Sequence, residues 1–225
     1  MLSILLVLPL IKASAVPRAT QALLPFLDPV LGLGSELTIA GSDGGEPLNV
    51  IVSAFSSASV LTDDGFRDWV GAIGFDLECL DISLGAPQQA NLGDGNGALN
   101  QIAQFQENFG IPIVGSCLES VTGGVHFSYW RQNGPSLLGL ANTGALFLAV
   151  SQEESLLGLH TIAPDGYNAG RNAFVAAAVG SVSSGGVTYT TTALNVTGLL
   201  LPGSLGISQG IAQDGIVTLL TVIAT

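Results

Sequence analysis

Glycine and proline divide this chain into short segments, and this division constrains its fold more than any other feature. The 225 residues include 30 glycines and 10 prolines, together about 18%, which is below the roughly 25–30% that is typical of disordered chains. Hydrophobic residues make up 48% of the chain, enough to bury one sizeable core. The sequence therefore predicts a folded domain built from short strands and helices.

The apolar runs between the turns show two periodicities. Runs that are rich in β-branched residues or alternate in polarity predict strands at 48–54, 76–84, 125–131, 145–151, 187–197 and 215–224. Helical spacing of apolar residues predicts helices at about 59–72, 98–109 and 167–179, the first of them capped by Thr62. This order predicts an α+β fold, a two-layer sandwich of a mixed β-sheet and about three helices. A doubly wound α/β arrangement is the alternative.

The first 15 residues have the pattern of a secretory signal peptide. Residues 2–11 are apolar except for one serine, and 13–15 are the small residues Ala-Ser-Ala, which suit a cleavage site. Ten residues are too few to span a bilayer as a helix. The alternative is an uncleaved helix that packs on the core. Residues 16–47 are rich in proline and glycine and predict an arm, linker or propeptide, followed by a single globular domain at 48–225.

Two further features favour an extracellular protein. Cys79 and Cys117 are the only cysteines, and in an oxidising compartment they can form one disulfide bond. Two buried free thiols are the alternative. Asn195 begins an Asn-Val-Thr acceptor sequence for N-glycosylation. We therefore expect a secreted glycoprotein with no transmembrane span.

The charge balance excludes several classes of function. Acids outnumber Lys and Arg by 17 to 5, which gives a net charge of −12 and argues against nucleic acid and anionic membranes. Lys12 is the only lysine, and it lies in the signal-like segment. Walker A loops, protein kinases and pyridoxal phosphate enzymes all require a lysine. The sequence predicts no cofactor.

One segment concentrates polar residues that could form a site. His160, Asp165 and Arg171 lie within 12 residues that lead into the predicted helix at 167–179. A loop over a helix N-terminus can bind an anion, and a carboxylate can orient a catalytic histidine. We take His160 and Asp165 as catalytic candidates. The alternative is structural: Asp165 caps the helix, Arg171 pairs with Asp165 or with one of the acids Glu153 and Glu154, and His160 packs in the core.

The second histidine lies on a strand. Alternation along 125–131 places His126, Ser128 and Trp130 on one face and Phe127, Tyr129 and Arg131 on the other. Both histidines with Asp165 could bind a metal, but there is no short His-x-His or His-x-x-x-His spacing to support this. The sequence therefore predicts no metal site.

The segments 126–131 (HFSYWR), 145–151 and 160–172 resemble the LssY C-terminal domain family. The resemblance covers about residues 46–180. It implies that His126, Trp130, His160, Asp165 and Arg171 are the matching ligand-site positions, and it suggests an association with phospholipid or the cell envelope. Ser128 and Asn172 depart from the arginine and aspartate usual in that family.

Three functions follow as hypotheses. The first is a secreted globular protein with a small-ligand or anion site around 160–171. The second is a hydrolase acting on a phosphoester or lipid head group, and the third is a surface or matrix protein that self-associates through an exposed sheet edge. Whether the protein is an enzyme is left open by the sequence.

Overall fold

A computed structural model describes residues 24–41, 44–79, 86–111, 114–134, 142–159 and 161–225. The helices are α1 (Asp63–Ala72), α2 (Val114–Thr122) and α3 (Gly166–Ala178). The strands are β1 (Val50–Val52), β2 (Phe75–Leu77), β3 (Gln89–Asn91), β4 (Ala98–Asn100), β5 (Ala103–Glu107), β6 (Gly124–Arg131), β7 (Leu146–Glu153), β8 (Gly180–Ser184), β9 (Val187–Thr197) and β10 (Ile216–Ala224).

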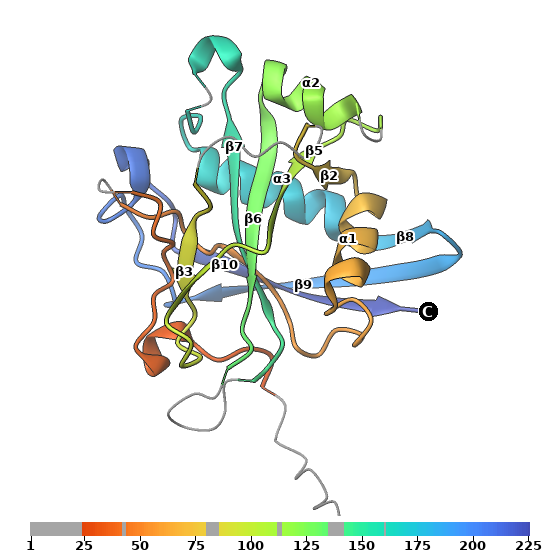
Figure 1. The fold of residues 1–225 in the computed structure, drawn as a ribbon, viewed down its shortest axis with the longest axis horizontal. Coiled ribbons are helices and arrows are strands. Elements are labelled where there is room, and N and C mark those ends of the chain that lie inside the picture. The colour runs from red at the N-terminus through yellow and green to blue at the C-terminus, as the bar shows by residue number, and fades with distance from the viewer. Residues whose placement is uncertain (1–23, 42–43, 80–85, 112–113, 135–141, 160) are drawn as a thin grey trace, which may run out of the picture.

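Eight of these strands form one mixed sheet in the order β2-β5-β6-β7-β1-β10-β9-β8, and β3 and β4 form a separate hairpin. The pair β1–β10 is parallel, and the other pairs in the large sheet are antiparallel. Figure 1 shows α3 crossing the sheet and α1 beside it. The predicted α+β class is confirmed.

The sheet has a different covering on each face. On one face, Phe66 of α1 and Phe174 of α3 pack against Phe127 of β6, and Trp69 of α1 packs against Phe174. On the other face, Phe147 and Trp130 form a second core with Leu92 and with Phe26 from the N-terminal arm. From Leu24 onward, the predicted arm is therefore part of the domain's packing. No helix among the described residues is long and apolar enough to cross a membrane.

Helix α1 shows why the prediction succeeds where local signals agree. Thr62 accepts a hydrogen bond from the Gly65 amide, and Asp63 and Asp64 lie in the first turn, where acids interact favourably with the helix dipole. Phe66, Trp69 and Val70 are buried, as their spacing predicts. The helix begins at Asp63, later than the predicted start near residue 59.

The predicted helix at 98–109 is wrong. Residues in this segment form β4 and β5, and β5 pairs with β2 and β6. The helical spacing of Leu99, Ile102 and Phe105 competes there with the alternating sequence of 103–107, Ala-Gln-Phe-Gln-Glu. Pairing with two neighbouring strands satisfies the backbone of β5 and buries Phe105, so tertiary contacts decide the outcome. Helix α2 and strand β8 were not predicted.

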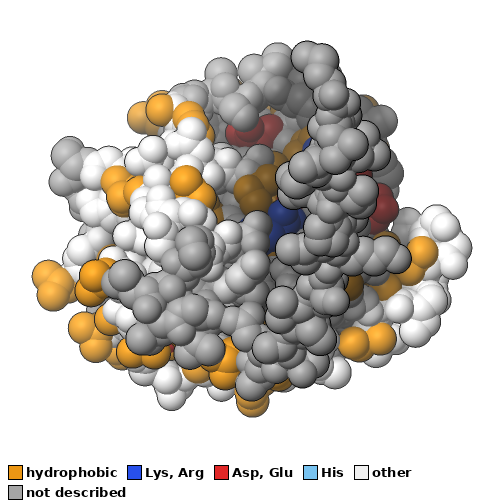
Figure 2. All heavy atoms as spheres, turned by 60° about the horizontal axis from the view of Figure 1, so that its bottom comes forward, with side chains coloured by type: hydrophobic (Ala, Val, Ile, Leu, Met, Phe, Trp, Pro, Cys, Tyr) orange, Lys and Arg blue, Asp and Glu red, His pale blue; other side chains and the backbone are white. Residues whose placement is uncertain are grey.

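The surface carries few charged groups. Figure 2 shows hydrophobic side chains reaching the surface at several separate places on the face turned to the viewer. Large exposed apolar residues include Leu157 and Leu205, which are 94% and 93% exposed. This surface follows from a composition with only 10% charged residues.

Candidate carboxylate–histidine site

The neighbouring strands β6 and β7 place His126 on the face of the sheet opposite the core that contains Phe127. His126 pairs with Ser151 across the two strands, and its Nε2 lies 3.2 Å from Ser151 Oγ. Trp130 and Phe147 belong to the core on this same face, whereas Phe127 and Tyr129 belong to the other core. The predicted sharing of a face by His126 and Trp130 is confirmed.

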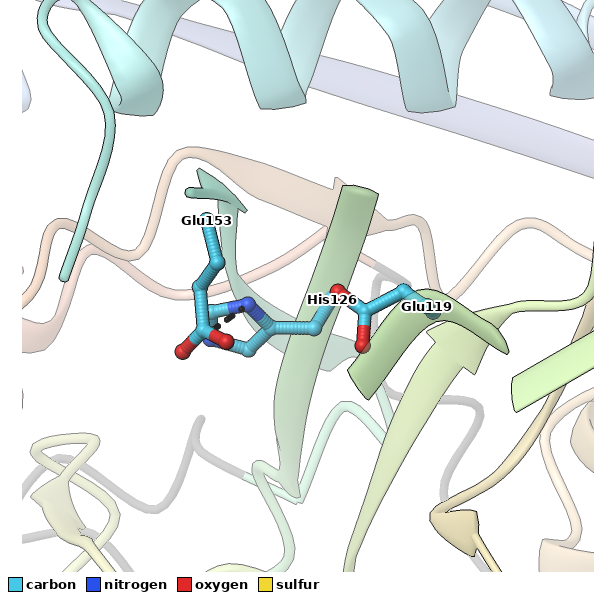
Figure 3. Close-up of side chains that lie close together, drawn as sticks. All are labelled: Glu119, His126 and Glu153. Atoms are coloured by element: carbon cyan, nitrogen blue, oxygen red, sulfur yellow. Dashed lines mark ion pairs between the residues drawn. The ribbon is translucent and has the colours of Figure 1, made fainter. Parts of the chain in front are cut away.

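Two glutamates reach His126 from different elements, as Figure 3 shows. Glu153 ends β7, and its Oε1 lies 3.5 Å from His126 Nδ1. Glu119 comes from α2. One ligand atom from each of the three side chains lies within 4.8 Å of the other two. The tertiary structure thus gathers two carboxylates and one imidazole that are far apart in the sequence.

Two glycines allow Glu119 to approach the sheet. Gly123 has a φ of +76°, a conformation that glycine adopts without strain, and it ends α2 one residue before β6. At Gly124, a Cβ atom would lie only 2.8 Å from Cγ of Glu119. The disulfide bond between Cys79 and Cys117 also tethers α2, two residues before Glu119. The predicted cysteine pair is confirmed.

The site is largely withdrawn from solvent. Glu119 is fully buried and His126 is 5% exposed, while the side chain of Glu153 is 18% exposed. Among the residues that the structure describes, neither carboxylate oxygen of Glu119 has a hydrogen-bond partner. Burying a carboxylate without a partner is costly, so Glu119 favours either protonation or a bound cation.

Burial and mutual repulsion act on both carboxyl groups. Burial, with smaller contributions from Glu107 and Glu78, raises the pKa of Glu119 to about 7. The pKa of Glu153 rises to about 8. Burial is the largest cause, and repulsion from the negative charges of Glu119, Glu46 and Glu78 adds to it. Both groups titrate near neutral pH, where a cation can compete with their protons.

The three donors suit a divalent transition metal. Zinc is bound by histidine nitrogen and carboxylate oxygen at about 2.0–2.2 Å, and two tetrahedral ligands at that distance lie about 3.4 Å apart. The 3.5 Å between His126 Nδ1 and Glu153 Oε1 is close to this spacing. Ser151 at Nε2 is the kind of outer partner that orients a metal-binding imidazole.

The polar segment that precedes and begins α3 has a different role. The guanidinium of Arg171 makes two hydrogen bonds with the carboxylate of Asp214, at 2.7 and 2.8 Å, and another with the Ile216 carbonyl. These bonds from Arg171 hold the pKa of Asp214 below its usual value. Arg171 is only 3% exposed, so its charge is committed to joining α3 to the start of β10.

Asp165 belongs to the same structural network. It precedes α3 with a left-handed backbone and makes no capping hydrogen bond with its side chain. Its Oδ1 accepts a hydrogen bond from Asn168, and Asn168 Oδ1 accepts one from the backbone amide of Asp214. Asp165 and Arg171 are therefore linked through Asn168 and Asp214, so this segment has a structural role. The contacts differ from those of the structural alternative, because the Asp165 side chain does not cap α3 and Arg171 pairs with Asp214 in place of Asp165, Glu153 or Glu154.

Of the remaining candidates, the structure describes Trp130 and Asn195, and these two lie in different parts of the fold. His160 lies outside the described residues. Trp130 is a core residue whose indole donates to the Leu99 carbonyl, and Asn195 is exposed on β9, where its side chain accepts from Thr218. The helix α3 packs on the face of Phe127 and Val150, whereas His126 lies on the opposite face. The structure therefore does not bring His126 and Arg171 into one site.

No family model, no curated protein and no solved structure matches this chain. The resemblance to the LssY C-terminal family therefore stays a prediction from the quoted segments.

Sequence reasoning missed Glu119 and treated Glu153 only as a possible partner of Arg171. A signal for Glu153 was present, because 125–131 and 145–151 are consecutive predicted strands. If consecutive strands pair antiparallel, the residues that start one strand lie beside those that end the other. No comparable signal existed for Glu119, because α2 itself was not predicted.

Proposed function

We propose that this protein binds a divalent transition-metal ion, of which zinc is the type, through Glu119, His126 and Glu153. The observation that carries the proposal is the buried carboxylate of Glu119. It has no hydrogen-bond partner in the described part of the chain and lies beside an imidazole and a second carboxylate. A bound cation would neutralise both carboxylates and satisfy the lone pairs of Glu119.

The donor set favours zinc-like ions over calcium. Calcium takes six to eight oxygen ligands in an open, flexible arrangement, whereas imidazole suits zinc and related metals. His126 would bind through Nδ1, which faces Glu153, with Nε2 donating to Ser151 Oγ. Three protein ligands leave one position of a tetrahedral ion for water or another small ligand.

Metal binding by this site depends on pH in a defined direction. The carboxyl groups of Glu119 and Glu153, with pKa values raised to about 7 and about 8, must lose their protons to bind the ion. We expect affinity for Zn²⁺ to rise steeply between pH 6 and pH 8, with protons released on binding.

Isothermal titration calorimetry on protein stripped with a chelator tests the proposal. We expect one Zn²⁺ per chain, a much weaker response to Ca²⁺, and at least about tenfold weaker zinc binding in Glu119→Gln and in His126→Ala. Glu154→Gln is the matched control, because Glu154 is the partly exposed sequence neighbour of Glu153 and should bind zinc as the parent does.

Two results would contradict the proposal. One is the absence of stoichiometric zinc binding at pH 8. The other is zinc binding that Glu119→Gln and Glu154→Gln weaken equally, which would indicate nonspecific attraction to a chain of net charge −12.

We further propose that the protein works outside the cytoplasm. The disulfide between Cys79 and Cys117 is the support, because such bonds are rare in reducing compartments. N-terminal sequencing of the protein recovered from the culture medium of an expressing cell tests secretion and the predicted cleavage after residue 15. Retention of the whole chain inside the cell would oppose it.

Hydrolysis of a phosphoester is the second candidate function. The open coordination position expected for a three-ligand site favours it, since catalytic zinc sites keep such a position. The test is turnover of p-nitrophenyl phosphate by zinc-loaded protein. Activity that is lost in Glu119→Gln and kept in Glu154→Gln would support an enzyme, and equal rates with and without protein would exclude this reaction.

A further inference from the structure

The large sheet ends in two edge strands, β2 and β8, and the two edges are protected differently. Natural proteins shield an edge strand with charges, bulges or a covering element, because its unpaired backbone groups can bind another strand. Strand β2 contains Asp76, is followed by Glu78 and packs beside α2. Strand β8 has the sequence Gly-Ser-Val-Ser-Ser and pairs with β9 residue for residue. The β8 edge therefore has neither a charge nor a bulge to protect it.

The pairing of β9 shows which backbone groups of β8 point outward. Residues of an antiparallel pair alternate between hydrogen-bonded and non-hydrogen-bonded pairs. Thr188 exchanges backbone hydrogen bonds with Thr225, on the side of β9 where β10 lies. Its partner on β8, Ser183, therefore belongs to a non-hydrogen-bonded pair, and by alternation Ser181 does too. The backbone N–H and C=O groups of both serines thus point away from β9.

Side-chain contacts agree with this orientation. Ser181 Oγ lies 3.0 Å from Thr190 Oγ1, and Ser183 Oγ lies 2.9 Å from Thr188 Oγ1, which is the close approach expected of non-hydrogen-bonded pairs. Both serines are exposed. Within the described part of the chain, β8 pairs with β9 alone, and no backbone hydrogen bond joins Ser181 or Ser183 to any other segment. These outward groups are therefore available to another strand.

The region around this edge contains few charged side chains. From residue 172 to residue 225 the only one is Asp214. It pairs with Arg171 and precedes the end of β10 that is farther from β8. Helix α1 packs beside β8 and brings Asp68 near Tyr189. Two copies of a chain with a net charge of −12 repel each other, and contact through the β8 edge keeps most of their acids apart.

The outward groups of β8 are complementary to those of a second copy. When two β8 strands lie antiparallel with a two-fold axis at Val182, Ser181 of each copy pairs with Ser183 of the other. Each outward N–H then donates to an outward C=O of the other copy, so all of these groups are used. A register centred on Ser183 would instead pair Ser181 with Gly185 in the turn, whose φ is +57°.

We propose that β8 joins two copies of this chain edge to edge, in an antiparallel pairing centred on Val182 that makes their large sheets continuous. Figure 1 shows the β8–β9 hairpin projecting at the right of the molecule, beyond the helices. Each copy contributes one short strand, and interfaces below about 1,000 Å² are typical of weak, transient association. We expect a dissociation constant on the order of 100 µM.

Sedimentation equilibrium between about 10 µM and 1 mM protein, with a chelator present, measures the association. Ser183→Pro removes one outward N–H, and an edge strand tolerates proline where the N–H faces solvent. We expect this variant to dimerise at least about tenfold more weakly. Ser183→Thr is the matched control, because threonine keeps the N–H and a hydroxyl and should associate as the parent does. A thermal melt checks that the proline variant is folded.

Cysteine cross-linking tests the register and leaves the backbone unchanged. In the proposed dimer the two Val182 residues form a non-hydrogen-bonded pair with Cα atoms about 4.5 Å apart, a separation that a disulfide can bridge. Val182→Cys should form linked dimers in a glutathione redox buffer. Ser184→Cys is the control. Its position is more exposed than Val182, but its Cα would lie roughly 14 Å from its counterpart, so it should cross-link at least about tenfold more slowly.

Three outcomes overturn the proposal: a parent that is monomeric at about 1 mM, equal association of the parent and folded Ser183→Pro, or cross-linking of Val182→Cys no faster than that of Ser184→Cys. Cross-linking decides the matter if Ser183→Pro does not fold. In the sheet, β7, β1, β10 and β9 separate β8 from β6, which carries His126. Glu119→Gln should therefore associate as the parent does, and failure here is distinguishable from failure of the metal site.

Discussion

Replacing Glu119 by glutamine should stabilise the metal-free protein at alkaline pH and not at acidic pH. The pKa of this carboxyl rises from its ordinary value of 4.5 to about 7 in the folded chain. At 1.36 kcal/mol per pH unit, a rise of this size corresponds to about 3 kcal/mol. Glu119 is fully buried, so solvent screening does not reduce this value.

The sign follows from proton binding. The folded state holds the Glu119 proton more tightly than the unfolded state does, so the contribution of this group to stability is complete below about pH 4.5. The contribution is lost as pH rises through about 7. Glutamine does not titrate in this range. We therefore expect the free energy of unfolding of Glu119→Gln, relative to the parent, to increase by about 2.5 kcal/mol between pH 5 and pH 8, because the unfolded carboxyl is already mostly ionised at pH 5.

Urea denaturation followed by far-ultraviolet circular dichroism measures this difference, with a chelator in both buffers. Comparing the two pH values removes any constant cost of placing an amide in the site. Glu154→Gln should show a much smaller change. With excess Zn²⁺ at pH 8 the order should reverse, because zinc stabilises the parent more than the variant. The result that would refute this reasoning is a stability difference between variant and parent that is the same at pH 5 and at pH 8 without metal. It would mean that ionising Glu119 in the folded protein has no extra cost.

Three further predictions concern the surrounding framework. Arg171→Ala should destabilise the fold by about 2–3 kcal/mol, because it leaves Asp214 without its partner. The melting temperature in differential scanning calorimetry should fall by about 5–10 °C, and an unchanged melting temperature would show that the pair is dispensable. The double replacement of Cys79 and Cys117 by serine should cost about 4 kcal/mol in urea denaturation, because it opens a loop of 38 residues, and equal midpoints would contradict this. Gly124→Ala should weaken zinc binding several-fold in calorimetry, because its new Cβ displaces the α2 carboxylate, and unaltered affinity would show that the carboxylate does not bind the ion.

Local sequence signals succeeded where they agreed with one another. The Thr62 cap, the two acids after it and the apolar spacing all predicted α1. Alternation along β6 correctly placed His126 and Trp130 on one face. The cysteine pair was also predicted, because a chain with two cysteines allows only one intramolecular bridge.

Local signals failed where long-range pairing outweighed them. The apolar spacing of 98–109 suits a helix, yet β5 gains hydrogen bonds from two neighbouring strands. The cluster of polar residues at 160–172 resembled a binding site, but Asp214 lies 43 residues beyond Arg171 and neutralises it. A partner this far away in the sequence cannot be identified from the residues around Arg171.

The amino-acid sequence by itself was enough to predict the fold class, the cysteine pair and the face that each β6 residue occupies. These properties depend on composition and on short-range periodicity, both of which can be read from the sequence without knowing which distant residues come into contact. Only the tertiary structure decided which charges meet. The register of β6 with β7 and the return of α2 to the sheet place Glu119 and Glu153 beside His126. Burial then sets the pKa of these carboxyl groups, because the cost of a charge depends on what surrounds it in space.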